Sequence, residues 1–155
     1  MNTKRIFSSL VIALTALLLL TATAAQAQTS CLASAQFYRH RADAWYAKDE
    51  FDRAIADYDR ALTFDPREAV AYHHRGLTWA AKGDLGLAIA DYNRAIKLNP
   101  RYALAYASRG VARLQQGKEA EAARNFEAWL NLGANLRPLI AASIEQIKRR
   151  AAVQP

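Results

Sequence analysis

Apolar and polar positions follow each other along most of the chain with the period of an α-helix. In the middle of the chain, Tyr72 and Gly76 lie on one face of a first segment. Ile89, Tyr92 and Ile96 share one face of a second segment, again at intervals of three or four residues. Such spacing is typical of amphipathic helices that bury one stripe, and no segment alternates as a strand would. The pattern therefore predicts an all-α protein.

Turn-forming residues divide this pattern into separate helices. Pro66 and Pro100 end two of them, because proline cannot continue the backbone hydrogen-bond ladder. Lys82-Gly83-Asp84 forms a turn, with Asp84 as the expected N-cap of the next helix. Pro138 falls in the first turn of the last helix, where proline is tolerated. The expected helices span 36–47, 51–64, 69–81, 85–98, 103–115, 119–131 and 136–150.

The helices come in pairs that repeat every 34 residues. The same types of residue recur at this spacing: Tyr38, Tyr72 and Tyr106; Arg41, Arg75 and Arg109; Ala42, Gly76 and Gly110; Ala54, Ala88 and Ala122; Tyr58, Tyr92 and Phe126. The small residues let two helices approach closely, and the aromatic residues fill the space beside them. A larger residue at Gly76 should overpack this contact, at a cost of about 1–3 kcal/mol.

A 34-residue period with this order of tyrosine, small, aromatic and proline positions resembles the tetratricopeptide repeat. Residues 35–68 and 69–102 match well, and 103–134 drift in their second half, as a terminal repeat does. The resemblance implies an α-solenoid of three helix pairs within 35–134, with 135–155 as a capping helix and tail. The cap would cover the apolar face that the last repeat leaves open.

In tetratricopeptide proteins the first helix of each pair lines a concave groove that holds a peptide, so the resemblance implies a binding surface here. The expected groove residues lie opposite the packing stripe: Gln36, Arg39, Asp43 and Tyr46; Val70, His73 and Leu77; Leu104, Ala107 and Val111. This surface is polar in the first repeat and apolar in the other two. We expect the apolar part to take an apolar segment of a partner protein, with Arg39 and Asp43 fixing its polar end. The alternative is that these aliphatic side chains pack against the cap or the N-terminal segment.

One branch of the family holds the C-terminal carboxylate of chaperones with Lys, Asn and Arg at set groove positions. The matching positions here are Arg39, Asp43, Leu77, Leu104 and Ser108. Only Arg39 keeps the positive charge, and Asp43 would repel a carboxylate. The sequence therefore argues against capture of a chaperone tail.

The row of Arg41, Arg75 and Arg109 has two interpretations. It is either a positive track for an acidic ligand or a set of ion pairs, since Asp57 and Asp91 recur with the same period. Matched opposite charges at one period favour ion pairs.

No catalytic site, cofactor site or metal site is expected from the sequence. Nucleophile motifs and phosphate-binding glycine loops are absent, as are metal-ligand spacings. The net charge of +7 includes Lys4 and Arg5 and a basic end at 148–150. This distribution is weak evidence for nucleic acid, which we do not expect as a partner.

The N-terminus has the order of a secretory signal. Lys4 and Arg5 precede an apolar run over 10–20, and Ala25-Gln26-Ala27 follows. We expect residues 1–27 to be a signal peptide cleaved after Ala27, leaving 28–34 as a loose segment. The alternative is an uncleaved anchor, but a spanning helix needs roughly 20 apolar residues. The mature chain would then have no transmembrane segment and would lie in a bacterial periplasm or be secreted.

The sequence thus predicts a protein–protein interaction adaptor of the bacterial periplasm or envelope and no enzyme. Two alternatives stay open: a module that associates with its own copies, and a factor that binds peptidoglycan through Trp45, Tyr46 and Trp79. Cys31 is the only cysteine, so it is either unpaired or joined to another chain.

Overall fold

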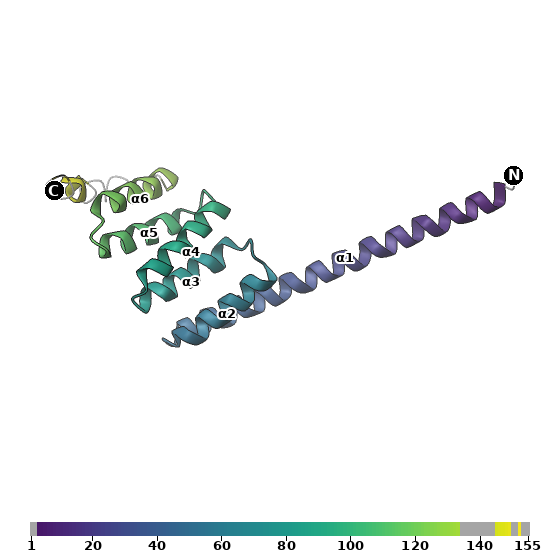
Figure 1. The fold of residues 1–155 in the computed structure, drawn as a ribbon, viewed down its shortest axis with the longest axis horizontal. Coiled ribbons are helices and arrows are strands. Elements are labelled where there is room, and N and C mark those ends of the chain that lie inside the picture. The colour runs from purple at the N-terminus through teal and green to yellow at the C-terminus, as the bar shows by residue number, and fades with distance from the viewer. Residues whose placement is uncertain (1–2, 134–144, 150–151, 153–155) are drawn as a thin grey trace.

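The computed structural model of the protein describes residues 3–133, 145–149 and 152. Within these ranges the chain folds into helices joined by short turns and forms no β-strand (Figure 1). The helices are α1 (Thr3–Tyr46), α2 (Phe51–Phe64), α3 (Ala69–Ala81), α4 (Leu85–Leu98), α5 (Ala103–Gln115) and α6 (Glu119–Leu132). The bounds predicted for α2 to α5 are confirmed, and α6 ends one residue later than expected.

The first helix is much longer than the sequence pattern predicted. It begins at Thr3 instead of residue 36, and residues 28–34, which we expected to be loose, belong to it. The physical reason is that no glycine or proline occurs between Thr3 and Tyr46, so nothing in the backbone interrupts the helix. Its N-terminal part projects away from the other helices (Figure 1). Among the helices that the structure describes, none has the length and apolar content needed to cross a membrane.

The helices pack as three pairs: the C-terminal part of α1 with α2, α3 with α4, and α5 with α6. Neighbouring pairs join through α2 against α3 and α4 against α5, which builds the stack seen in Figure 1. Each pair has a small core of its own, such as Ala42, Ala54 and Tyr58 in the first pair. Small cores joined through neighbour contacts are the defining property of a solenoid.

Close approach within the second and third pairs requires a residue without a side chain. A Cβ atom on Gly76 would lie 2.6 Å from Cε1 of Tyr92, and one on Gly110 would lie 2.7 Å from Cε1 of Phe126. Both distances are shorter than carbon atoms tolerate. The predicted fit of a ring against a glycine is therefore confirmed.

The turn inside each pair uses a left-handed residue. Gly83 and Gly117 have φ of 91° and 74°, and Asp49 occupies the same place in the first pair with φ of 59°. Asp84 stands at the N-cap position of α4 as predicted, but its side chain makes no capping hydrogen bond. The turn conformation thus depends on glycine twice and on aspartate once.

The C-terminal residues that the structure describes cover the end of the stack. Residues 145–149 are helical, and Ile147 packs against the cluster of Ala123 and Leu130. Lys148 forms an ion pair with Glu127 of α6. These contacts are those of the expected capping helix, although the rest of that prediction lies outside the described residues. The fold is the predicted all-α solenoid of three helix pairs with a C-terminal helix.

Candidate partner-binding groove

The first helices of the pairs form the inner side of the stack. In the described chain α3 contacts both α1 and α5, whereas α4 contacts neither α2 nor α6. The stack is therefore tighter on the side of α1, α3 and α5. A side on which neighbours crowd together is the concave side of a solenoid.

Large apolar side chains remain exposed on this concave side. Leu104 is 57% exposed and Val111 is 48% exposed. Tyr46, Val70 and Leu114 are among the other exposed apolar residues on the same helices. Large apolar side chains that gather on one exposed surface often mark a site where something binds.

A cavity of about 350 Å³ opens between these helices. It brings together Tyr46, Leu77 and Val111, which were all predicted groove residues from three different repeats. Its wall also includes Ser108, which the sequence placed at a groove position of the family, and three residues that sequence reasoning missed: Ala81, Tyr92 and Gln115. Ala81 and Gln115 are 34 residues apart at the ends of α3 and α5, so the repeat itself held the signal that could have found them.

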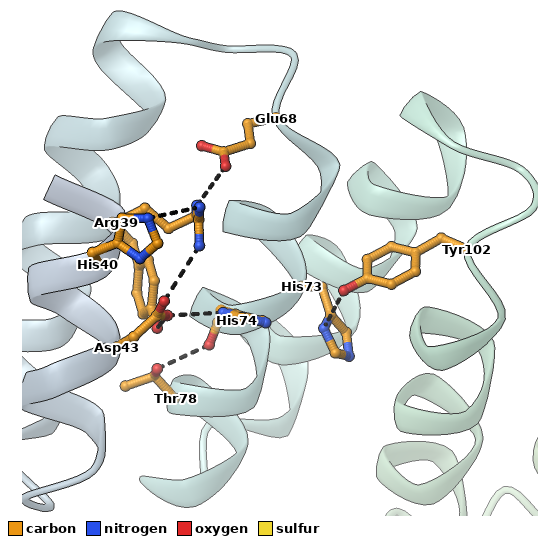
Figure 2. Close-up of polar contacts among 9 residues, drawn as sticks. Arg39, His40, Asp43, Glu68, His73, His74, Thr78 and Tyr102 are labelled. Atoms are coloured by element: carbon orange, nitrogen blue, oxygen red, sulfur yellow. Dashed lines mark hydrogen bonds and ion pairs between the residues drawn. The ribbon is translucent and has the colours of Figure 1, made fainter. Parts of the chain in front are cut away.

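The charged residues predicted to fix a ligand are engaged inside the protein. Arg39 Nε lies 2.6 Å from Oε1 of Glu68, and its Nη1 lies 3.4 Å from Oδ2 of Asp43 (Figure 2). Oδ1 of Asp43 accepts a hydrogen bond from the Tyr58 hydroxyl at 2.7 Å and lies 2.8 Å from Nδ1 of His74. Burial, together with the bond to Asp43, raises the pKa of Tyr58. This network joins the first two pairs, so the proposed role of Arg39 and Asp43 in holding a ligand is not supported by their contacts.

His73 was also predicted to line the groove, but it is only 4% exposed. Nδ1 lies 3.0 Å from the Tyr102 hydroxyl (Figure 2). Nε2 lies 3.0 Å from Oγ of Ser108. Burial and the neighbouring His74 lower the pKa of His73 to about 4. A neutral ring with both nitrogens bonded joins the second and third repeats and is not available to a partner.

The other predicted groove residues lie outside the cavity. Val70 and Leu104 are exposed near the N-terminal ends of α3 and α5. Gln36 is exposed at the corresponding place within α1. Ala107 is partly buried on α5. The cavity therefore concentrates at one end of the first helices, and the remaining candidates extend the surface along them.

Two members of the arginine row, Arg41 and Arg75, form ion pairs, as the sequence favoured, whereas Arg109 bonds to the amide oxygens of Asn125 and Asn93. Arg41 donates to both carboxylate oxygens of Asp57, at 2.6 and 2.8 Å, and lowers the pKa of Asp57. Arg75 binds Asp91 in the same way and also bonds to Asp59 of the preceding pair, at 2.5 Å. These arginines hold helices together instead of presenting a free positive track.

Groups suited to metal chemistry do not gather in the residues that the structure describes. No three histidine, cysteine, aspartate or glutamate side chains come together there as metal ligands would. Cys31 is an exposed free thiol on α1.

Two models of tetratricopeptide repeats match the sequence. A model described as "Tetratricopeptide repeat" covers residues 15–69, and one described as "TPR repeat" covers residues 79–117. A search of curated proteins found no match.

Solved structures with the same architecture are numerous. The first TPR of Spaghetti (RPAP3) bound to the HSP90 peptide SRMEEVD is 26% identical, with a TM-score of 0.72, over 78% of this chain and 95% of that one. The second TPR of the same protein, bound to the same peptide, is 30% identical, with a TM-score of 0.66, over 69% and 98%. MamA is 31% identical, with a TM-score of 0.63, over 64% and 58%. The chain belongs to the tetratricopeptide-repeat family.

Proposed function

We propose that the chain is a protein–protein interaction adaptor that binds an apolar segment of a partner protein in its concave groove. The observation that carries this proposal is the cavity of about 350 Å³ whose wall includes Leu77 and Val111. Apolar walls with a few polar groups are typical of sites that bury a ligand. The adaptor role involves no catalysis by this chain.

Likeness to peptide-bound repeats supports the same function. Both TPR structures of Spaghetti (RPAP3) described above contain a peptide, and this chain covers nearly their whole length. The peptide in them is acidic, whereas Arg39 of this chain is already paired with Glu68, and Asp43 adds a negative charge. An apolar segment therefore fits this groove better than an acidic tail.

The adaptor's place is proposed from the sequence of its first residues. We propose that it acts in a bacterial periplasm or envelope, after cleavage behind Ala27. Cleavage there would leave the three core clusters intact, since Ala35 is the first buried apolar residue among those whose burial the structure describes. N-terminal sequencing of the protein isolated from its own cells should give Gln28 as the first residue. Recovery of the intact N-terminus would remove the proposal of a cleaved signal.

The groove itself is tested by a charge placed on its exposed apolar wall. Val111→Asp suits this better than Leu77→Asp, because Leu77 also packs against the core cluster of the second pair. A photo-crosslinking amino acid at Val111 first identifies the partner, and synthetic peptides from that partner are then titrated by fluorescence anisotropy. We expect Val111→Asp to weaken peptide binding at least about tenfold, because a buried unpaired charge is costly.

Leu87→Asp is the matched control. Leu87 is 50% exposed, much like Val111, but it stands on α4 outside the cavity. Far-UV circular dichroism must show that both variants keep the wild-type helix content. Equal affinities for the two variants would contradict binding in the groove. Crosslinks between two copies of the chain would instead favour self-association, which sedimentation at several concentrations would check.

A further inference from the structure

The third repeat departs from the arginine pairing of the other two. In the second repeat Arg75 donates to both oxygens of Asp91, at 2.7 and 2.6 Å. At the corresponding place in the third repeat, Arg109 donates to Oδ1 of Asn125 and to Oδ1 of Asn93, both at 2.6 Å. Both acceptors are neutral amides. The guanidinium of Arg109 therefore bonds through Nε and Nη1 but has no carboxylate as its partner.

Three neighbouring positions change together with this loss. At the spacing of 34 residues, Arg113 stands in place of Trp79, Arg124 in place of Ala90, and Ala128 in place of Arg94. A bulky ring and a long side chain are thus replaced, and a cavity of about 390 Å³ opens between α5 and α6. Arg109, Arg113 and Arg124 all lie on its wall, together with Tyr106. The cavity shares no residue with the groove.

The cavity carries an excess of positive charge. Its one acidic wall residue, Glu121, is paired with Arg113 at 3.2 Å. Two of the three guanidinium charges therefore have no carboxylate in the part of the wall that the structure describes. Burial and the nearby Arg113 lower the pKa of Arg109, whereas the carboxylate-bound Arg75 has a raised pKa. A bound anion would reverse that effect on Arg109.

We propose that this cavity is a binding site for a doubly charged oxyanion of the phosphate type. Two uncompensated positive charges match a dianion, and guanidinium groups offer paired N–H donors that suit its oxygens. Asn125 can donate only one of its two amide N–H groups to the anion, because its Nδ2 already donates to the backbone oxygen of Glu121 at 2.6 Å. The site lies on a different face from the groove, so the protein would bind a partner segment and an anionic group independently.

Calorimetric titration of the full chain with inorganic phosphate tests the site. The titration is run at constant ionic strength, with chloride as the balancing anion, so that general screening does not change. We expect saturable binding of phosphate and weaker binding of acetate. Arg124→Gln, which changes an exposed side chain, should raise the phosphate dissociation constant at least about tenfold.

A second variant restores the counter-charge of the other repeats. Asn125→Asp recreates the pairing seen at Asp91 and should abolish phosphate binding without loss of helix. Arg94→Gln is the control, because Arg94 is an exposed arginine on α4 at the position of Ala128. The proposal would be overturned if titration with phosphate released no more heat than titration with chloride. So would equal weakening by Arg124→Gln and Arg94→Gln, or acetate binding as tight as that of phosphate.

Discussion

Acidification from pH 7 to pH 5 should destabilise the protein through His73. This ring is buried between the second and third repeats, and its pKa is about 4 in the folded chain against 6.5 ordinarily. As the pH falls, the unfolded chain takes up the proton first, because its histidine has the higher pKa. The stability that the neutral ring provides is therefore complete well above pH 6.5 and is lost as the pH falls from there toward 4.

The size of the effect follows from that pKa difference. Each pKa unit is worth about 1.4 kcal/mol, and most of the difference is expressed by pH 5, so the loss between pH 7 and pH 5 is about 2 kcal/mol. Asp57 does not contribute in this window. Arg41 lowers the pKa of Asp57 below 3.8, and its stabilisation is lost only at a lower pH.

Urea denaturation followed by circular dichroism at pH 7 and pH 5 measures this loss. His73→Gln has no titrating ring, so the free energy of unfolding of that variant should fall by about 2 kcal/mol less than that of the wild type. His40→Gln, which removes an exposed histidine, is the control for the substitution itself. The reasoning is refuted if His73→Gln and the wild type lose the same amount of stability.

Two substitutions test the backbone features of the helix pairs. Gly76→Ala should lower the free energy of unfolding by about 1–3 kcal/mol, because its Cβ would lie 2.6 Å from the Tyr92 ring. Gly86→Ala is the control in the same thermal melts. A Cβ there meets nothing within 4 Å, so this variant should be neutral or slightly stabilising. Asp49→Gly should raise the free energy of unfolding by about 0.5–1 kcal/mol, because it relieves a left-handed conformation; a lower melting temperature would contradict this.

The sequence could predict the bounds of a helix wherever a helix-breaking or turn-forming residue marks them. Pro66 and Pro100 fix the ends of α2 and α4, and Gly83 fixes the turn between α3 and α4. The start of α1 could not be predicted in this way, because the expected boundary near residue 36 rested on the repeat pattern and on no helix-breaking residue. A repeat shows where a unit begins and does not show where a helix stops.

The sequence could predict which face of a helix a groove residue occupies, but not whether its side chain is exposed there. Spacing placed His73 beside Leu77 on one face of α3, yet His73 is buried and Leu77 lines the cavity. The difference arises from Tyr102, which lies in the link before α5 and reaches back to the His73 ring. A single-helix pattern contains no information about a residue that reaches the helix from a distant link.

On the first helices of the three pairs, polar side chains hold neighbouring repeats together, and apolar side chains remain exposed for a partner. Asp43 and His73 join neighbouring pairs on the concave side, and the bond from Arg75 to Asp59 does the same on the other side of the stack. Polar side chains that hold neighbouring repeats in register cannot also bind a partner without weakening the stack. What the groove offers a partner is then mainly apolar surface, whose attraction does not depend on direction. Selectivity of the groove must therefore come from its shape, whereas the anion site that we propose would place charge selectivity in the third repeat, where Asn125 replaces the carboxylate that the other repeats keep.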